Sequence, residues 1–333
     1  MPRIVPILAA ALTVGLVACG GRAESSDEAV DGRLRVVTTI SPLTNIVANV
    51  AGELARVEGV VPEGIDAHTF EPAPSTAKLL SQADVVFLNG LGLEEPTLQL
   101  ATANAKEGAR LVELGDTTLK EAEYIYDSSF PEAGGDPNPH LWTNPRYARR
   151  YAELVMETLA ERDPANTEAY RRNFERLASR LDELERVLAT VTSSVPEANR
   201  KLVSYHDSFP YFARDFGWTI VGAVQPADFT DPTPRELAEL IAQLRREGVP
   251  AIFGSRAFPS PILEQIARET DANYVEDLRD DDLPGEPGDT DHSLLALLQF
   301  DYTAIVDALG GDSTELRGFD ATNPTRDEAH YPQ

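Results

Sequence analysis

Two blocks of alternating strand and helix patterns constrain the fold of this chain more than any other feature of its sequence. The first block predicts four strands rich in β-branched and apolar residues, at 33–40, 55–61, 84–89 and 110–114. The alternation restarts after residue 200 and predicts four more, at 201–205, 219–224, 251–254 and 274–278. Strands that alternate with helices build parallel sheets covered on both faces. The sequence therefore predicts an α/β protein of two lobes, each with a central, mostly parallel sheet flanked by helices.

A long helical pattern lies between the two blocks, at 168–192. Its leucines recur at spacings of three or four residues: Leu177, Leu181, Leu184 and Leu188. A helix of this length would span about 35 Å, roughly the diameter of a domain. We interpret it as a helix that connects the lobes.

Shorter helices are predicted between the strands. One begins at Ser41, which can cap it, and has Pro42 in its first turn. In the second block a helix is predicted at 207–216, and others follow at 234–247, 261–270 and 293–309.

The length of 333 residues is sufficient for two domains. We divide the chain into a first lobe at 33–162, a connecting helix at 163–193, a second lobe at 194–310 and a tail at 311–333. The tail has few apolar residues, so we expect it to be loosely held.

The balance of charge is strongly acidic, with 55 acidic and 29 basic residues and a formal net charge of −26. Such a surface repels nucleic acid and enriches cations near itself. We therefore expect no nucleic-acid partner. The charge by itself does not identify a cation site, because solubility alone can account for it.

The N-terminal residues resemble a bacterial lipoprotein signal. Arg3 precedes an apolar run of 15 residues, which is too short to span a bilayer comfortably, and small residues lead to Cys19, the only cysteine. We predict a signal peptide at 1–18, lipidation of Cys19 and a flexible tether at 19–32. The mature protein would then be anchored to the bacterial cell membrane, outside the cytoplasm, with no disulfide within the chain.

Three of the five histidines share a structural context. His68 follows the second predicted strand, His206 directly follows the fifth, and His140 precedes a helix at the close of the first lobe. Ligands of open α/β sheets bind beyond the carboxyl ends of the strands, so these imidazoles are expected to face one cleft between the lobes. We expect His292, beside an acidic run, to be a solvated surface residue, and His330 to have no role.

The loop that holds His140 contains three prolines within 136–145, together with Trp142. Prolines exclude regular helix or central strand, so the loop is rigid and irregular. It could be a preformed ligand site or a plain turn with a packed tryptophan. The choice between these two interpretations depends on whether other metal-binding side chains lie near His140.

An acidic run at the exit of the last strand supplies a fourth candidate ligand, Asp281. Three imidazoles and one carboxylate suit Zn²⁺ or Mn²⁺ better than Ca²⁺ or Mg²⁺, which prefer oxygen ligands. Scattered histidines are common, however, and the acidic run could be a solvated loop. No metalloprotease helix, nucleophile elbow or glycine-rich phosphate loop occurs in the sequence.

These segments resemble the cluster A-I solute-binding lipoproteins of bacterial zinc and manganese ABC importers, over about residues 33–310. The segment 66–72 reads Asp-Ala-His-Thr-Phe-Glu-Pro, where the family has Asp-Pro-His-x-Tyr-Glu-Pro. The family's Pro-His-x-Trp occurs at 139–142, and its third ligand segment is similar to 204–212. The family's Leu-Tyr-Ser-Asp-Ala-Leu-Gly aligns best with 278–283, which makes Asp281 the counterpart of the carboxylate ligand.

The resemblance implies two four-stranded lobes joined by a long rigid helix, with the metal in the cleft between them. It implies a monomeric binding protein, and no enzyme, that captures Zn²⁺ or Mn²⁺ on His68, His140, His206 and Asp281 and delivers it to an ABC permease. Metal affinity should fall near pH ~6.5 as protons compete for the imidazoles.

The departures from the family pattern leave two points open. Residues 115–139 contain no histidine, whereas many zinc-specific members have a histidine-rich loop, so zinc and manganese both remain candidates. Asp280 and Asp282 are alternatives to Asp281 as the fourth ligand.

Two other functions are alternatives: a surface zinc hydrolase with Glu71 or Asp207 as general base, and an adhesin or binder of an organic solute.

Overall fold

The computed structural model of the chain describes residues 32–225, 232–256 and 260–333. The predicted signal peptide, Cys19 and nearly all of the predicted tether lie outside the described residues. Residues 33–333 form one compact unit. In the described ranges no helix is both long enough and apolar enough to cross a membrane.

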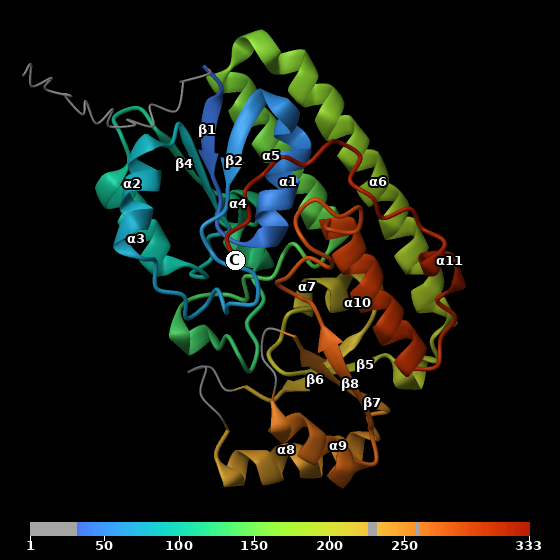
Figure 1. The fold of residues 1–333 in the computed structure, drawn as a ribbon. Coiled ribbons are helices and arrows are strands. Elements are labelled where there is room, and N and C mark those ends of the chain that lie inside the picture. The colour runs from blue at the N-terminus through green and yellow to red at the C-terminus, as the bar shows by residue number, and fades with distance from the viewer. Residues whose placement is uncertain (1–31, 226–231, 257–259) are drawn as a thin grey trace, which may run out of the picture. The chain divides into compact units, whose positions relative to one another are not determined.

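The first sheet has four parallel strands in the order β2-β1-β3-β4. The strands are β1 (Leu34–Val37), β2 (Ala55–Glu58), β3 (Val85–Leu88) and β4 (Arg110–Glu113). Its helices are α1 (Ser41–Ala51), α2 (Pro74–Gln82), α3 (Glu95–Asn104), α4 (Leu114–Thr118) and α5 (Pro145–Arg162). In Figure 1, α2 and α3 lie on one side of the strands and α1 and α5 on the other. We call this part the first lobe.

The second sheet repeats the plan, with four parallel strands in the order β6-β5-β7-β8. The strands are β5 (Lys201–Ser204), β6 (Thr219–Ala223), β7 (Ala251–Ser255) and β8 (Asn273–Leu278). Its helices are α7 (Pro210–Phe216), α8 (Pro234–Glu247), α9 (Pro261–Thr270) and α10 (Leu294–Ala308). We call this part the second lobe. The predicted fold class, two parallel four-stranded sheets flanked by helices, is confirmed.

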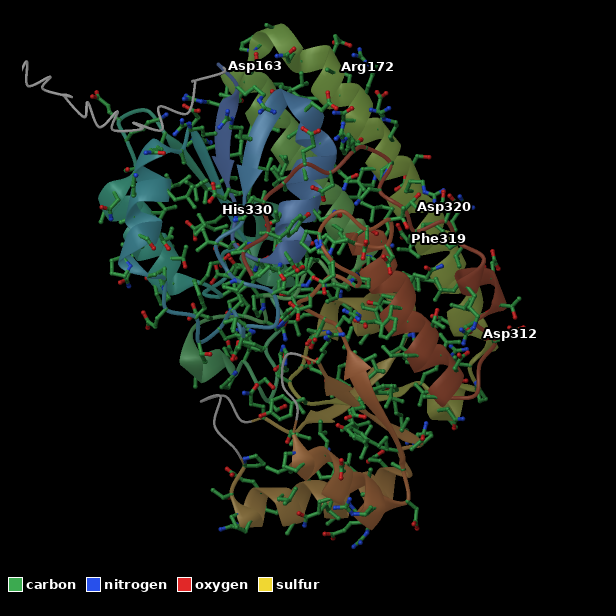
Figure 2. The ribbon with its side chains drawn as sticks, in the orientation of Figure 1. Asp163, Arg172, Asp312, Phe319, Asp320 and His330 are labelled. Atoms are coloured by element: carbon green, nitrogen blue, oxygen red, sulfur yellow. The ribbon has the colours of Figure 1, made fainter. Side chains whose placement is uncertain are left out.

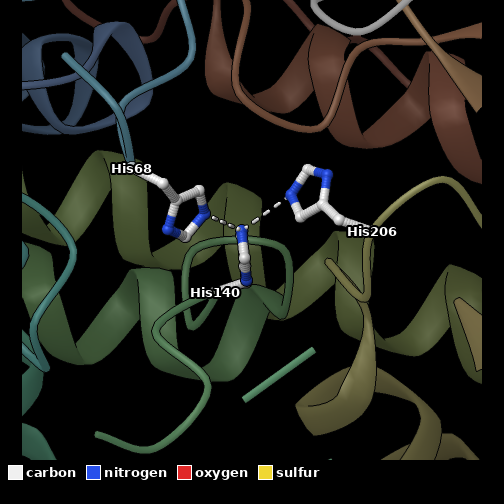
Figure 3. A group of neighbouring side chains, drawn as sticks. All are labelled: His68, His140 and His206. Carbon is white, nitrogen blue, oxygen red and sulfur yellow. Dashed lines mark hydrogen bonds between the residues drawn. The ribbon is translucent and has the colours of Figure 1, made fainter. Parts of the chain in front are cut away.

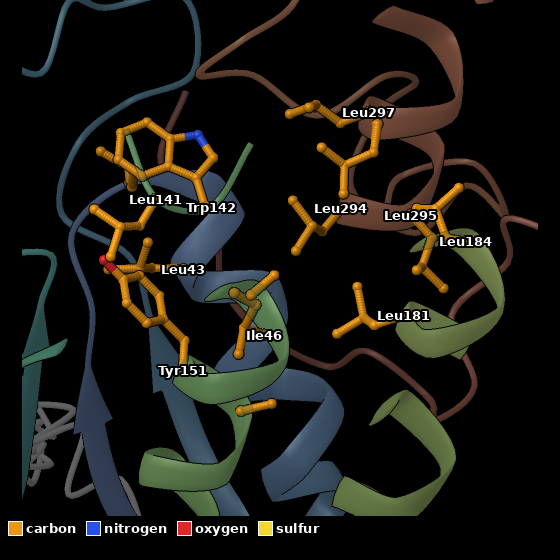
Figure 4. Close-up of a cluster of buried hydrophobic side chains, with 14 of the residues drawn as sticks. Leu43, Ile46, Leu141, Trp142, Tyr151, Leu181, Leu184, Leu294, Leu295 and Leu297 are labelled. Atoms are coloured by element: carbon orange, nitrogen blue, oxygen red, sulfur yellow. The ribbon is translucent and has the colours of Figure 1, made fainter. Parts of the chain in front are cut away.

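The helix between the lobes, α6 (Thr167–Ser194), has 28 residues and is about 42 Å long. It packs against α1 and α5 of the first lobe and against α7 and α10 of the second. Its buried stripe includes the predicted leucines Leu177, Leu181, Leu184 and Leu188. Figure 4 shows Leu181 and Leu184 beside Leu294 and Leu295 of α10, within a core cluster that draws residues from both lobes.

The start of α1 differs from the prediction in one respect. The helix begins at Ser41 with a proline in its first turn, but the Ser41 hydroxyl makes no cap. It donates instead to the carbonyl oxygen of Asp281, at 3.2 Å. In the second lobe the helix predicted from residue 207 begins at Pro210, because 206–209 form the loop that follows β5.

The chain after α11 (Thr314–Arg317) is not loosely held, so that prediction was wrong. The His330 amide donates to the carbonyl of Val57, and the Gly59 amide donates to the carbonyl of His330, both at 2.9 Å. Tyr331 is buried. These contacts use main-chain and polar side-chain groups, so the low apolar content of the segment gave no sign of them.

Candidate metal centre

The three predicted histidines come together from three loops, two of which follow strands. His68 lies in the loop after β2, His206 directly follows β5, and His140 lies in the proline-rich loop before α5. His140 and His206 are fully buried, and His68 remains partly exposed. The parallel order of each sheet explains the positions of His68 and His206, because each lies beyond the carboxyl end of a strand.

The ring nitrogens converge on a single point (Figure 3). Nε2 of His140 lies 3.3 Å from Nε2 of His68 and 3.1 Å from Nε2 of His206. Each of the three residues offers a ligand atom, and these atoms lie within 4.8 Å of one another. Three neutral imidazoles that aim nitrogens at one point form a donor set suited to a transition-metal ion.

The environment of the cluster keeps the imidazoles neutral. Burial lowers the pKa of His68 and His140 well below the ordinary value of 6.5, and the neighbouring imidazoles lower both further. Burial also lowers the pKa of His206, to about 4. The neutral ring is the form that binds metal. Protons should therefore compete with metal for these imidazoles only at a pH below the ~6.5 expected for an ordinary histidine.

Asn138 fixes the orientation of His140. Its Oδ1 lies 2.9 Å from Nδ1 of His140 and accepts the His140 amide at 3.0 Å. An amide oxygen only accepts, so Nδ1 carries the proton and Nε2 presents its lone pair to the cluster. The Asn138 amide group donates to the carbonyl of Asp207 at 2.6 Å and to Asp127 at 2.9 Å. One buried side chain thus ties the His140 loop to the loop of His206.

The three consecutive aspartates have different surroundings. Asp280 accepts hydrogen bonds from the hydroxyls of Ser208 at 2.9 Å and Ser255 at 2.7 Å. Asp282 accepts the amide of Gly64, at 2.8 Å, in the loop that leads to His68. Both carboxyl oxygens of Asp281 are buried and have no hydrogen-bond partner among the described residues.

Asp281 is therefore an isolated buried carboxyl group. Burial raises its pKa well above the ordinary value, and the charges of Asp280 and Asp282 raise it further. Ionising such a group without a partner is costly, and a cation would remove that cost. The described group of ligand atoms that lie within 4.8 Å of one another contains the three histidines and does not include Asp281. Of the three aspartates, Asp280 contacts the cluster, with Oδ2 3.9 Å from Nδ1 of His206.

The backbone of this run is held from within the second lobe. Asp301 of α10 accepts the amides of Arg279 at 2.8 Å and Asp280 at 3.1 Å. Asp280 has φ 22°, in the left-handed region that is strained for a residue with a side chain. Sequence reasoning missed Asp301. Its signal is an acidic residue within a largely apolar helix, α10, where it is fully buried.

A second missed residue, Glu94, supports the turn after β3. Its buried carboxylate accepts the Thr39 hydroxyl at 2.6 Å and the amides of Asn89 at 2.7 Å and Gly90 at 3.1 Å. The Asn89 amide group in turn donates to the carbonyl of Pro139, at 3.0 Å, directly before His140. Burial raises the pKa of Glu94 to about 7.

A cavity of about 190 Å³ reaches the cluster at His68. Its wall includes Leu91, Gly92, Phe130, Asp136 and Pro139. The Phe130 ring lies 5.4 Å from the ring of His68 and 5.6 Å from that of His140. The cavity thus lies along the exposed side of His68.

The surroundings of His292 contradict the prediction of a solvated residue. Only 2% of it is exposed. Its Nδ1 lies 3.3 Å from the carbonyl of Pro284, its Nε2 lies 3.6 Å from Glu63, and the ring of Tyr331 covers it at 4.5 Å. It is buried because the C-terminal segment around Tyr331, about forty residues later in the chain, packs against it.

The two candidate general bases lie outside the histidine group found in the described part of the chain. Glu71 is exposed. Asp207 is fully buried beside Asp127, and burial together with that neighbouring charge raises its pKa well above the ordinary value. The surroundings of Glu71 and Asp207 therefore give no indication that either residue is a general base for a metal-bound water.

Fold and site together define a class: two-lobed α/β binding proteins whose site is formed by loops at the ends of the strands. The chain belongs to the family described as zinc-uptake complex component A, periplasmic, whose model matches residues 36–308. The family predicted from the sequence motifs is confirmed.

Proteins similar to this chain are named for metal binding or as the substrate-binding lipoprotein of a metal ABC transporter. The metal ABC transporter substrate-binding lipoprotein FimA of Streptococcus parasanguinis is 29% identical over 89% of this chain and 96% of its own length. The manganese-binding lipoprotein MntA of Halalkalibacterium halodurans is 32% identical over 73% of this chain and 78% of its own. A metal-free periplasmic metal binding protein mutant of Candidatus Liberibacter asiaticus superposes with a TM-score of 0.74 at 28% identity, covering 83% of this chain and 100% of its own.

Proposed function

We propose that this protein captures a divalent transition-metal ion outside the cytoplasm and delivers it to an ABC permease for import. The observation that carries the proposal is the convergence of three neutral imidazole nitrogens within 4.8 Å of one another. His68, His140 and His206 supply these nitrogens, and Asp281 supplies a carboxylate as the fourth ligand.

Two observations support Asp281 as the fourth ligand. In the described acidic run, both carboxyl oxygens of Asp281 are buried without a hydrogen-bond partner, whereas the carboxylates of Asp280 and Asp282 accept hydrogen bonds. The charge of Asp66 also acts on both His206 and Asp281, so a common neighbour links this carboxyl group to the histidine cluster.

The donor set favours Zn²⁺ or Mn²⁺ as the transported ion. Three imidazoles and one carboxylate match the ligands of these ions, and Ca²⁺ and Mg²⁺ prefer oxygen. The family carries zinc in its description, and one relative is named for manganese. Four protein ligands fill a tetrahedral site, whereas a hydrolytic metal keeps a position for water. We therefore propose a binding protein without catalytic activity.

The proposed location follows from the N-terminal sequence. Lipidation of Cys19 after removal of residues 1–18 would anchor a monomer to the cell membrane, and the tether at 19–32 would let it reach a permease. FimA and MntA are named as lipoproteins, which supports this arrangement.

Calorimetric titration of the purified mature protein with Zn²⁺ and with Mn²⁺ tests the proposal, together with elemental analysis of the protein as purified. We expect one site per chain with a Kd far below micromolar for at least one ion. Binding no tighter than micromolar for both would contradict the proposal. His330→Ala is a matched control for alanine variants of the three ligands, because its side chain is exposed.

A further inference from the structure

The segment 319–333, which we call the strap, connects the two lobes. Figure 2 labels its beginning, Phe319 and Asp320, near α6, and its far end, His330, beside the first sheet. It lies outside residues 36–308, which the family model matches. Its contacts are therefore a feature of this chain that family membership does not describe.

The beginning of the strap is bound to the second lobe and to α6. Ser293, which caps α10, donates its hydroxyl to the carbonyl of Ala321 at 2.6 Å. Gln299 of α10 donates to the carbonyl of Phe319 at 2.8 Å. The guanidinium of Arg180 lies 4.7 Å from the ring centre of Phe319. This end is fixed by both α10 and the connecting helix.

Asn323 joins the lobes through a single side chain. Its amide nitrogen donates to the carbonyl of His292, at 3.0 Å, in the second lobe. Its amide oxygen accepts from Asn45 at 3.0 Å and Asn49 at 2.8 Å, both on α1 of the first lobe. An alanine at position 323 would remove all three bonds and leave two buried amides with fewer partners.

The far end of the strap pairs with β2, an edge strand of the first sheet. Its main chain exchanges hydrogen bonds with Val57 and Gly59 through His330, and the Glu63 amide donates to the carbonyl of Pro332 at 3.3 Å. Tyr331 anchors this end, since its hydroxyl donates to Asp327 at 2.6 Å and its ring covers His292. The strap thereby holds residues 59–63, which lead directly to the loop of His68.

We propose that the strap is a positioning segment, which holds the His68 loop against the second lobe and thereby slows release of the bound metal. The inference rests on the proposed function. The His68 loop is fixed on one side by the strap at 59–63 and on the other by Asp282, which accepts the Gly64 amide. The amides of Val60 and Val61 also donate to the carbonyl of Thr39, at 3.3 and 3.1 Å. Loosening the strap removes the restraints at Gly59 and Glu63, so His68 moves away from His140 more often and the ion dissociates faster.

The test uses Asn323→Ala and Tyr331→Ala in the full chain, with Glu328→Gln, an exposed residue of the same segment, as control. Zn²⁺ release into excess chelator is followed by stopped flow, and the absorption spectrum of the Co²⁺-loaded protein reports the ligand geometry. Hydrogen exchange of the metal-free protein reports the amides of 59–68. We expect release at least ~10-fold faster in both variants, an altered Co²⁺ spectrum and faster exchange at 59–68, with the control unchanged.

The outcomes separate this inference from the function on which it rests. If the unsubstituted chain binds no metal, the proposed function fails, and exchange at 59–68 still decides whether the strap positions that loop. If both variants lose thermal stability but keep the parental release rate, spectrum and exchange at 59–68, the strap is only structural and the inference is overturned. Should Tyr331→Ala fail to fold because the residue is buried, Asn323→Ala decides alone.

Discussion

The indole nitrogen of Trp142 donates a hydrogen bond to the main-chain carbonyl of Asp280, at 2.8 Å. The bond joins the loop of His140, in the first lobe, to the aspartate run of the second. The same ring lies 5.0 Å from the ring of His140, and Trp142 is fully buried. Two loops that carry proposed ligands are therefore fixed to each other, which would reduce the ordering cost of metal binding.

Trp142→Phe tests this bond. The variant keeps an aromatic ring but leaves the Asp280 carbonyl without its donor, so we expect a loss of about 1–3 kcal/mol in the free energy of unfolding and a weaker affinity for metal. Urea unfolding and calorimetry measure the two quantities. Trp218→Phe is the matched control, because its indole donates to Thr192 at 3.3 Å and touches none of the proposed ligands. Equal effects of both substitutions on affinity would contradict a specific role for Trp142.

Asp281→Asn should separate metal binding from stability. We expect affinity to fall by at least ~100-fold, beyond the usual effect of losing a residue that only supports a ligand. The metal-free variant should be more stable than the parent, because a buried carboxyl group without a partner is replaced by a neutral one. Asp182→Asn, on the exposed face of α6, should change neither quantity. A large loss of affinity in Asp280→Asn with none in Asp281→Asn would identify Asp280 as the ligand instead.

The pH dependence of affinity should follow Asp281, not the histidines. The raised pKa of Asp281 means that the empty site keeps a carboxyl proton to higher pH, and the ion must displace it. The lowered pKa values of the imidazoles mean that they are already neutral there. Zn²⁺ affinity should therefore rise with pH as this carboxyl group loses its proton in the parent, and this rise should be absent in Asp281→Asn. Titrations in buffers of different ionisation enthalpy count the protons released, and a parental slope in the variant would refute this assignment.

Glu94→Gln should change how stability depends on pH. Since the folded pKa, about 7, lies above the ordinary 4.5, the folded protein binds the proton more tightly than the unfolded chain does. This contribution to stability is complete below pH ~4.5 and is lost as pH rises to about 7, a change of about 3 kcal/mol. Relative to Glu94→Gln, the parent should therefore lose stability between pH ~4.5 and ~7. Urea unfolding at several pH values measures the difference, and the exposed Glu95→Gln should run parallel to the parent.

The fold could be predicted from the sequence because each strand and helix carries its own local pattern. The strands then place His68 and His206 beyond their carboxyl ends, and the proline-rich loop before α5 places His140 beside them. His292 could not be placed in the same way, since its burial depends on Tyr331, far along the chain. Local sequence did not decide among the three aspartates either, because their directions depend on a strained backbone at Asp280 that Asp301 holds in place.

The start of α1 shows the same limit on a smaller scale. A serine followed by proline predicts a capped helix start, and the helix does begin there. The hydroxyl nevertheless bonds the Asp281 carbonyl, 240 residues away, because the fold brings that carbonyl into reach. The local sequence pattern predicts where α1 begins, but the tertiary structure determines which group the Ser41 hydroxyl hydrogen-bonds.

The continuous buried stripe of α6 couples the two sheets in unfolding. Tyr170 and Leu177 lie on it in the same core cluster as α1 and α5, and Leu188 and Val191 extend it to the part of α6 that packs on the second lobe. Separating either lobe would expose that stripe to water, at a cost of roughly 25 cal/mol for each Å² of apolar surface. Neither sheet can melt alone without opening the core of the other, so heat or urea should unfold residues 33–333 in one cooperative transition.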